Sequence, residues 1–130
     1  MKRFHDYRLV AYSVRSFGNE IVLHLVHDYP PEPKTESHIK FSDVAAYHFI
    51  HTGGAIITDI EQVPLAQILE KVGDKLTRWW QQHGGYIHWD DDRSKYEAVL
   101  EEQGYKAWFL ASAVGFEGFV IARAAEEVPS

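Results

Sequence analysis

The hydrophobic period of the chain changes at Pro64. Before it, apolar residues alternate with polar ones in several short stretches, a pattern typical of strands that bury one face. After it, apolar residues recur at spacings of three and four over residues 64–83, which indicates an amphipathic helix. Since strands precede and follow the helical part, the sequence predicts an α+β fold rather than an alternating α/β fold.

The first two strands form a predicted hairpin. Residues 6–15 alternate, and residues 20–27 are again rich in β-branched and aliphatic side chains. Gly18 and Asn19 lie between them and suit a tight turn, because both residues tolerate positive φ. Simple alternation divides the first strand into one face with Tyr7, Leu9, Ala11 and Ser13 and another with Arg8, Val10, Tyr12 and Val14.

Further strands are expected before Pro64. Residues 28–37 contain three prolines and no apolar pattern, so we expect an exposed loop there. Residues 38–51 suit two short strands that break near Ser42 and Asp43, or one bent strand. After Thr52, Gly53 and Gly54, residues 55–61 form a strongly β-branched strand. The first half is therefore a meander of four or five strands, mostly antiparallel.

Two helices follow. The first is expected over residues 64–83, with Gly84 and Gly85 after it. Gly73 inside it indicates close packing on the sheet. The second is expected over residues 94–103, because Ser94 and Glu97 have the spacing of a capping box. Its predicted buried residues are Tyr96, Val99 and Leu100, and Gly104 would end it.

The last part returns to strands, over residues 105–115 and 119–125, with a turn from Gly115 to Gly118. We therefore predict one domain over residues 1–130. Its single, mostly antiparallel sheet comprises the N-terminal meander and a C-terminal hairpin, and two helices pack on one face.

Composition excludes several classes of function. The apolar fraction of 45% argues against disorder, and the absence of cysteine excludes disulfides, thiolate metal sites and thiol nucleophiles. The formal net charge of −6 disfavours binding to nucleic acid or to anionic membranes. The N-terminus lacks the apolar run of a signal peptide, and no stretch is long enough to span a bilayer. We expect a soluble cytoplasmic protein.

The chain contains eight histidines. His24 and His27 are three residues apart, as are His48 and His51, but residues three apart on a strand point to opposite faces. A metal site would therefore need one histidine from each of several strands, and His5, His24 and His48 are the candidates. Such a site would suit a small metal-dependent hydrolase.

His5 and Asp6 stand together just before the first strand. As a general base, His5 would need an orienting group other than Asp6, because neighbours in a strand diverge. The alternative is structural, with Asp6 accepting hydrogen bonds from backbone amides at the start of the strand.

Two acidic groups are candidates for binding. Asp90, Asp91 and Asp92 suit a cation or a basic partner, although they lack the spacing of a calcium loop and also suit the start of a helix. Asp59 and Glu61, two residues apart in a predicted strand, share one face.

Tryptophan and tyrosine residues are frequent around the predicted helices. They fit the contact between helix and sheet, and they also suit a pocket for a small ligand at that contact. No phosphate-binding glycine loop and no serine-elbow motif occurs in the sequence.

Three segments together resemble a group of small bacterial α+β domains: FHDYRLVAYSV with EIVLHL, IKFSDVAAYHF with AIITDIE, and AWFLASAVGFEGFVIA. Some members of this group resemble predicted immunity proteins, which bind and block a cognate toxin. The matching positions are His5, Asp6, Asp59, Ser112, Gly115 and Gly118. The resemblance implies no catalytic residue and no cofactor.

The leading prediction is a non-enzymatic domain that binds another protein. The acidic charge suits a basic protein partner, with Asp90 to Asp92 as the first expected contact and Asp59 with Glu61 as the second. Exposed sheet edges also allow a homodimer. A metal-dependent hydrolase and a small-ligand binder remain the alternatives.

Overall fold

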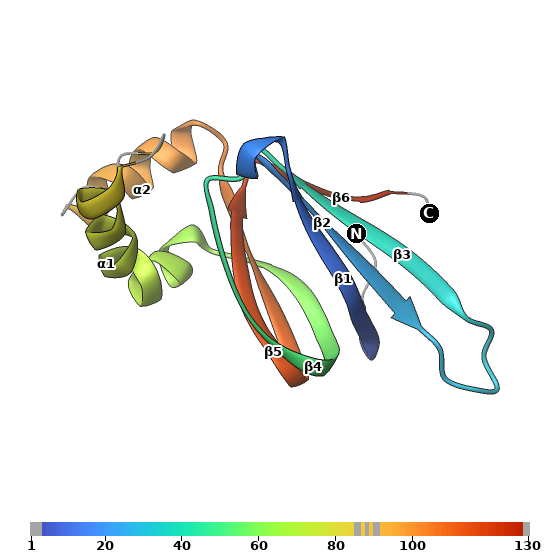
Figure 1. Cartoon of the computed structure of the whole chain (residues 1–130). Helices are drawn as coiled ribbons and strands as arrows, with labels where there is room; N and C mark the ends of the chain where they lie inside the picture. Colours follow the sequence, from blue (N-terminus) through green and yellow to red (C-terminus); the bar gives the residue numbers. More distant parts are fainter. Residues whose placement is uncertain (1–3, 85–86, 88, 90–91, 129–130) are drawn as a thin grey trace.

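A computed structural model describes residues 4–84, 87, 89 and 92–128, without the side chains of residues 51–55, 58 and 113–116. This part of the chain forms a six-stranded sheet and two helices (Figure 1). The elements are β1 (Tyr7–Arg15), the 3₁₀ turn η1 (Ser16–Gly18), β2 (Glu20–His27), β3 (Thr35–Ser42), β4 (Ala46–Val63), α1 (Leu65–His83), α2 (Arg93–Glu102), β5 (Lys106–Ala122) and β6 (Ala124–Val128). Each pair of neighbouring strands is antiparallel, so the predicted α+β class is confirmed.

The strand order is β5-β4-β1-β2-β3-β6. The two edge strands, β5 and β6, are consecutive in the chain and are separated only by Arg123. The chain therefore leaves one edge of the sheet and joins the other within a single residue, which requires the sheet to curl. At this point the backbone N–H of Arg123 bonds to the carbonyl of Ser42 at 3.1 Å, and that of Ala45 bonds to Ile121 at 2.8 Å.

β4 and β5 pair as one bent ribbon, from Ala46 opposite Ile121 to His51 opposite Phe116 and from Ile56 opposite Val114 to Val63 opposite Ala107 (Figure 1). The break expected near Gly53 and the turn expected from Gly115 to Gly118 are both wrong, because these residues lie within continuous strands. Glycine permits a strand to bend without ending it, so a glycine pair between apolar runs need not be a turn.

The ribbon separates two apolar clusters. Because strand residues alternate, Val120 faces the inside of the curled sheet and Ile121 faces the helices. The inner cluster comprises Phe4, Leu9, Ile21, Leu23, Leu25, Ile39, Phe41, Ile57, Ile60, Trp108, Leu110, Val120 and Ala122. The helix cluster comprises Leu65, Ile68, Leu69, Trp89, Tyr96, Leu100, Ala107, Phe119 and Ile121.

Both helices pack on the outer side of the ribbon, away from β1, β2 and β3 (Figure 1). α1 begins after Pro64 and ends at Gly84, whose φ of 73° suits glycine, as the sequence predicts. α2 forms, but the predicted capping box does not: the N-cap residue is Asp92, and Ser94 lies inside the helix. Val99, expected to be buried, is exposed on α2.

Gly73 allows the two helices to approach each other. A Cβ atom at this position would meet the hydroxyl of Tyr96 on α2, so the close contact is with the second helix rather than with the sheet. The Tyr96 hydroxyl forms a hydrogen bond with Thr77, and burial raises the pKa of Tyr96 above its usual value.

Within the described residues, no helix is long and apolar enough to cross a membrane.

Candidate interaction surface on strand β1

His5 and Asp6 form a tight turn that starts β1. Asp6 has a φ of 64°, and the N–H of Tyr7 bonds to the carbonyl of Phe4 at 3.1 Å. The turn brings Nδ1 of His5 to 2.9 Å from a carboxylate oxygen of Asp6, so the two side chains meet rather than diverge as expected in a strand. Both side chains are exposed.

Asp59 performs the role that the sequence suggested for Asp6. Its Oδ1 accepts hydrogen bonds from the backbone N–H of Ile60 at 2.8 Å and of Phe4 at 3.4 Å. Phe4 is fully buried in the inner cluster. Asp59 thus fixes the segment before β1 to β4, while Glu61 on the same strand is exposed.

The three candidate metal ligands are not brought together. His5 lies in the turn before β1, and His48 lies on β4 opposite Phe119, whose side chain belongs to the helix cluster. His24 stacks on His38 of β3 with ring centroids 4.4 Å apart and planes inclined by 13°. No group of three His, Asp or Glu side chains suited to a metal occurs among the residues that the structure describes.

The candidate acidic surface is only partly described. Asp90 and Asp91 lie outside the described residues, and Asp92 is exposed at the N-terminus of α2. The aromatic residues expected to line a pocket between sheet and helices include Trp89 and Tyr96. They contact each other edge to face, with ring centroids 5.3 Å apart, within the helix cluster.

Two of the family-like residues have clear structural contacts. The hydroxyl of Ser112 donates to the carbonyl of Ile56 at 2.8 Å, where the register between β4 and β5 shifts. Gly118 lies opposite Phe49, whose ring occupies the space that a side chain would need. Gly115 lies within β5.

A surface that sequence reasoning missed begins with a bulge in β1. Leu9 pairs with Leu25 and Ala11 pairs with His24, so Val10 is an extra residue on β1. A bulge bends its strand and can end pairing on one side. Just before the bulge, β1 pairs with β4, with Tyr7 opposite Ile57 and Arg8 opposite Ile56.

The bulge also moves Tyr12 and Val14 to the inner face. Their cross-strand partners on β2 are Leu23 and Ile21, both fully buried, and cross-strand partners share a face. The faces assigned by simple alternation are therefore wrong beyond Val10. Although they face inward, Tyr12 is 39% exposed and Val14 is 42% exposed.

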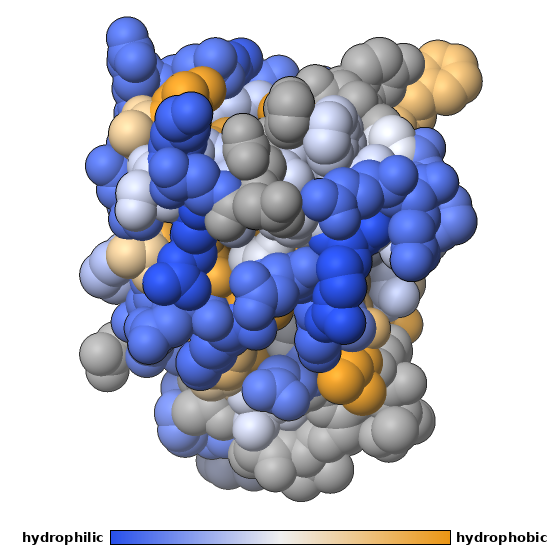
Figure 2. Space-filling view, turned by 90° about the vertical axis from the view of Figure 1, so that its left-hand side faces the viewer, coloured by the Kyte–Doolittle hydropathy of each residue, from blue (hydrophilic) through white to orange (hydrophobic). Residues whose placement is uncertain are grey.

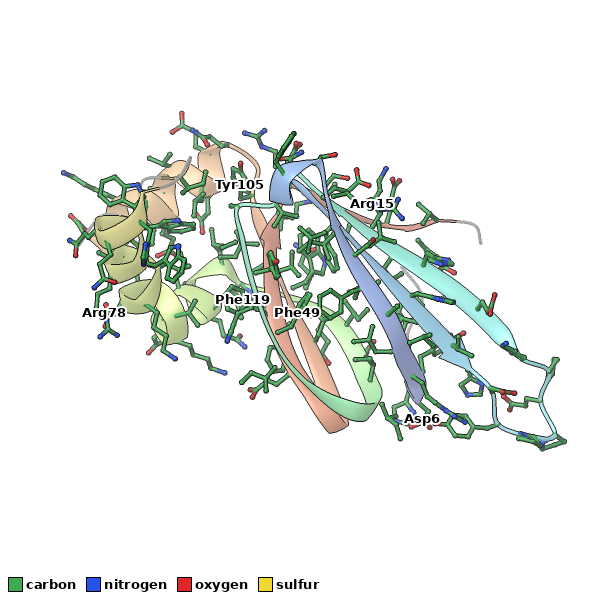
Figure 3. The ribbon with its side chains drawn as sticks, viewed as in Figure 1. Asp6, Arg15, Phe49, Arg78, Tyr105 and Phe119 are labelled. Atoms are coloured by element: carbon green, nitrogen blue, oxygen red, sulfur yellow. The ribbon has the colours of Figure 1, made fainter. Side chains whose placement is uncertain are left out.

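The first part of β4 contributes two more aromatic residues. Tyr47 is the cross-strand partner of the buried Val120, so it also faces inward, yet it is 40% exposed. Phe49 contacts Tyr12 edge to face with centroids 5.1 Å apart, and Tyr47 at 5.3 Å. Figure 3 shows Phe49 on the side of the ribbon that faces β1, whereas Phe119 lies toward the helices.

Phe17 completes the surface at the end of β1. Its side chain is fully exposed. Three consecutive residues of this turn have positive φ: Ser16 at 53°, Phe17 at 58° and Gly18 at 91°. A left-handed conformation costs a non-glycine residue about 1–2 kcal/mol. We name Tyr12, Val14, Phe17, Tyr47 and Phe49 the β1 surface.

The helix side of the molecule differs. On the face shown in Figure 2, hydrophilic residues predominate among the coloured atoms, and hydrophobic ones occur in separate small areas. The outer sides of the helices thus resemble an ordinary solvated surface. On the β1 surface, the Phe49 ring contacts those of Tyr12 and Tyr47, and Val14 and Phe17 are exposed farther along the chain. Exposed aromatic and aliphatic side chains of this kind are typical of interaction sites.

One sequence signal pointed to this region without identifying it. The turn contains Ser16 and Phe17 before Gly18, and an aromatic residue is unusual beside the glycine of a tight turn. The bulge has no such signal, because β1 carries no glycine or proline.

Comparisons with known proteins add no relative. No family model matches the chain, and neither the curated proteins nor the solved structures contain a match. The resemblance to small bacterial domains therefore stays a prediction.

Proposed function

We propose that this chain is a protein-binding module and that the β1 surface is its binding site. The observation that carries the proposal is the turn at Phe17. There the chain adopts unfavourable left-handed conformations at Ser16 and Phe17 and leaves the whole phenyl ring in water. Strained residues that persist in a fold often serve function, and exposed aromatic residues are frequent anchors in protein interfaces.

The neighbouring side chains support this role. Tyr12, Val14 and Tyr47 extend the apolar area from the turn along β1 and onto β4. Tyrosine provides a rigid apolar ring and a polar hydroxyl, and tyrosine is enriched where proteins bind one another. An immunity-type role, in which the chain binds and blocks a toxin, is the form of this function that the resemblance suggests.

A comparison of variants in a pull-down from the native lysate tests the proposal. We expect one stoichiometric partner with the unmodified chain, and Phe17→Ser to weaken its binding about tenfold or more. Val99→Ser is the matched control, because Val99 is an exposed apolar residue on α2, away from the β1 surface. Binding of the isolated partner is then measured by calorimetry with each variant.

The opposite result is informative. If Asp92→Lys abolishes binding while Phe17→Ser leaves it unchanged, the interface lies at the acidic stretch before α2 and the β1 surface is excluded.

A further inference from the structure

Although the helix side of the molecule is mainly hydrophilic, one ridge of α1 combines cations with an exposed tryptophan. Lys71, Lys75, Trp79 and His83 follow one another at intervals of four residues, so their side chains lie in one row along the helix, with Arg78 beside them. We infer that these five residues, which we name the α1 ridge, bind an acidic segment of another protein. This inference goes beyond the proposed function, because it concerns the helix side rather than the β1 surface.

Contacts of α1 show which way the ridge faces. Gly73 lies toward α2, since a Cβ atom on it would meet the Tyr96 hydroxyl. Lys71 instead lies over the ring of Phe109 on β5, with Nζ 5.6 Å from the ring centroid. Figure 3 shows Arg78 on the side of α1 away from the ribbon of β4 and β5. The ridge is therefore not the side of α1 that packs against α2.

Trp79 is the apolar centre of the ridge. It is 64% exposed, whereas Trp89 and Trp108 are buried. Its ring contacts that of His83, one turn later, with centroids 4.2 Å apart and planes inclined by 41°. This contact limits the orientations of the indole ring, so less side-chain entropy is lost when a partner covers it. Tryptophan is also among the residues that most often anchor protein interfaces.

Charge selects the partner. The stretch from Lys75 to His83 contains Lys75 and Arg78 and no acidic residue, although the whole chain carries a net charge of −6. Nε of Arg78 donates to the carbonyl oxygen of Asp74 at 3.4 Å. A guanidinium has five N–H donors and stays charged, so this bond leaves donors that suit a carboxylate. Cations beside an exposed aromatic ring thus fit a partner with carboxylates around an apolar residue.

The local charge of the ridge differs from that of the whole chain. The acidic residues of α1, Glu70 and Asp74, belong to another row, and Asp74 is close enough to Tyr96 of α2 to affect its pKa. Interactions between exposed charges are screened beyond about 8 Å at physiological ionic strength. The ridge is about 18 Å long from Lys71 to His83, since each helical residue adds about 1.5 Å. A short acidic segment along it is therefore governed mainly by the cations of the ridge.

A nucleic acid fits the ridge less well. Tryptophan stacks on bases, but a phosphate backbone carries a charge at every nucleotide and favours more cations than Lys71, Lys75 and Arg78 provide. The net charge of −6 also opposes a long polyanion. Carboxylates of a protein segment need to occur only opposite these three cations. The charge pattern thus favours an acidic protein segment.

Synthetic peptides test the inference with the intact protein. The first has aspartate and glutamate on both sides of a central leucine, and the second has asparagine and glutamine at the same positions. A single-stranded oligothymidylate is the nucleic-acid probe. Binding is followed by chemical-shift changes of the α1 backbone amides and of the Trp79 indole N–H, and the amide spectrum of each variant shows that its fold is retained.

We expect the acidic peptide to bind about tenfold more tightly than the amide peptide at low ionic strength, and salt should reduce this difference. Trp79→Ala should weaken binding of the acidic peptide about tenfold. Lys75→Gln with Arg78→Gln should weaken it about fivefold. Lys34→Gln with Lys106→Gln is the charge-matched control and should preserve binding, because neither lysine lies on α1.

Four results would overturn the inference. They are equal binding of the two peptides, undiminished binding by Trp79→Ala, an equal loss with the control pair of lysines, and tighter binding of oligothymidylate than of the acidic peptide. An equal loss with the control pair would mean that only the overall charge matters.

Phe17→Ser separates this inference from the proposed function. It should leave binding of the acidic peptide unchanged, because Phe17 belongs to the β1 surface. A loss of peptide binding with this variant would place the peptide on the β1 surface and exclude the α1 ridge. If the acidic peptide fails while a partner from the lysate still depends on Phe17, the ridge is excluded and the proposed function stands.

Discussion

β1 and β2 are neighbours in one sheet, yet they bury their inner faces to very different extents. Tyr12 on β1 is opposite Leu23 on β2, and Val14 is opposite Ile21. Both β2 residues are fully buried, whereas both β1 residues remain substantially exposed.

The two strands also differ in their surroundings. β2 pairs with β3 from Glu20 to His27 and with β1 from Glu20 to Val26. β1 pairs with β2 from Arg8 to Arg15 with a bulge at Val10, and with β4 at Tyr7 and Arg8. Tyr12 contacts the Phe49 ring of β4 edge to face, yet it keeps 39% of its surface exposed. Beyond the bulge, the inner face of β1 is therefore only partly covered.

The largest expected effect is on the β2 side of this comparison. Leu23→Ala should lower the free energy of unfolding by about 2–5 kcal/mol, because it leaves a cavity in the inner cluster. Tyr12→Ala, at the facing position, should cost less than half as much, since Tyr12 is already partly in water. Denaturant titration of both variants measures the difference, and equal losses would contradict the comparison.

A second prediction concerns Gly118, which leaves room for the Phe49 ring that contacts Tyr12. Gly118→Ala should destabilise the protein by about 1–3 kcal/mol, because its Cβ would meet the Phe49 ring and lie 2.7 Å from the His48 carbonyl oxygen. Gly73→Ala is the control. Its Cβ would meet only side-chain atoms of Tyr96 and Arg93, and alanine favours the helix, so the loss in thermal stability should be smaller.

The third prediction concerns the hydrogen bond between Tyr96 on α2 and Thr77 on α1. Tyr96→Phe should cost about 0.5–1.5 kcal/mol, because the hydrogen bond with Thr77 is lost. Burial raises the pKa of Tyr96, so the folded protein holds this proton more tightly than the unfolded chain. The contribution is complete below the usual pKa of 10.0 and declines as pH rises toward the raised pKa.

Chemical denaturation between neutral and strongly alkaline pH checks this sign. Stability of the unmodified protein should fall more steeply above pH 10.0 than that of Tyr96→Phe. Parallel curves would show that Tyr96 titrates equally in both states.

The smallest effect is expected for Val14, on the partly exposed inner face of β1. Val14→Thr should change the free energy of unfolding by less than about 0.5 kcal/mol, because the new hydroxyl remains hydrated. The same substitution at the fully buried Val120 should cost about 1–3 kcal/mol. A large loss at Val14 in thermal unfolding would mean that the inner face of β1 is covered.

Much of the fold could be predicted from local patterns. The first hairpin, the division of β3 from β4 near Asp43, and the position of α1 follow from alternation, turn residues and helical spacing. The ribbon could not, because Gly53 and Gly115 are equally compatible with a turn and with a bent strand. Only the pairing of β4 with β5 decides between them.

The candidate site was less predictable. The sequence drew attention to Asp59, but its role in fixing Phe4 depends on residues that are 55 positions apart. The histidines were equally prominent, yet the structure places His5, His24 and His48 apart. Tyr12 and Val14 attracted no attention, since exposure depends on neighbouring strands that a sequence pattern does not reveal.

The sequence by itself determined the first hairpin and the place of α1, because periodicity, proline and glycine act over a few residues. The tertiary structure alone decided the strand order, the bulge at Val10 and the exposure of the inner face of β1. These features depend on pairing between distant segments, since the face that a residue occupies changes with the register of its strand. The bulge at Val10 changes that register by one residue, and Tyr12 and Val14 face inward as a result.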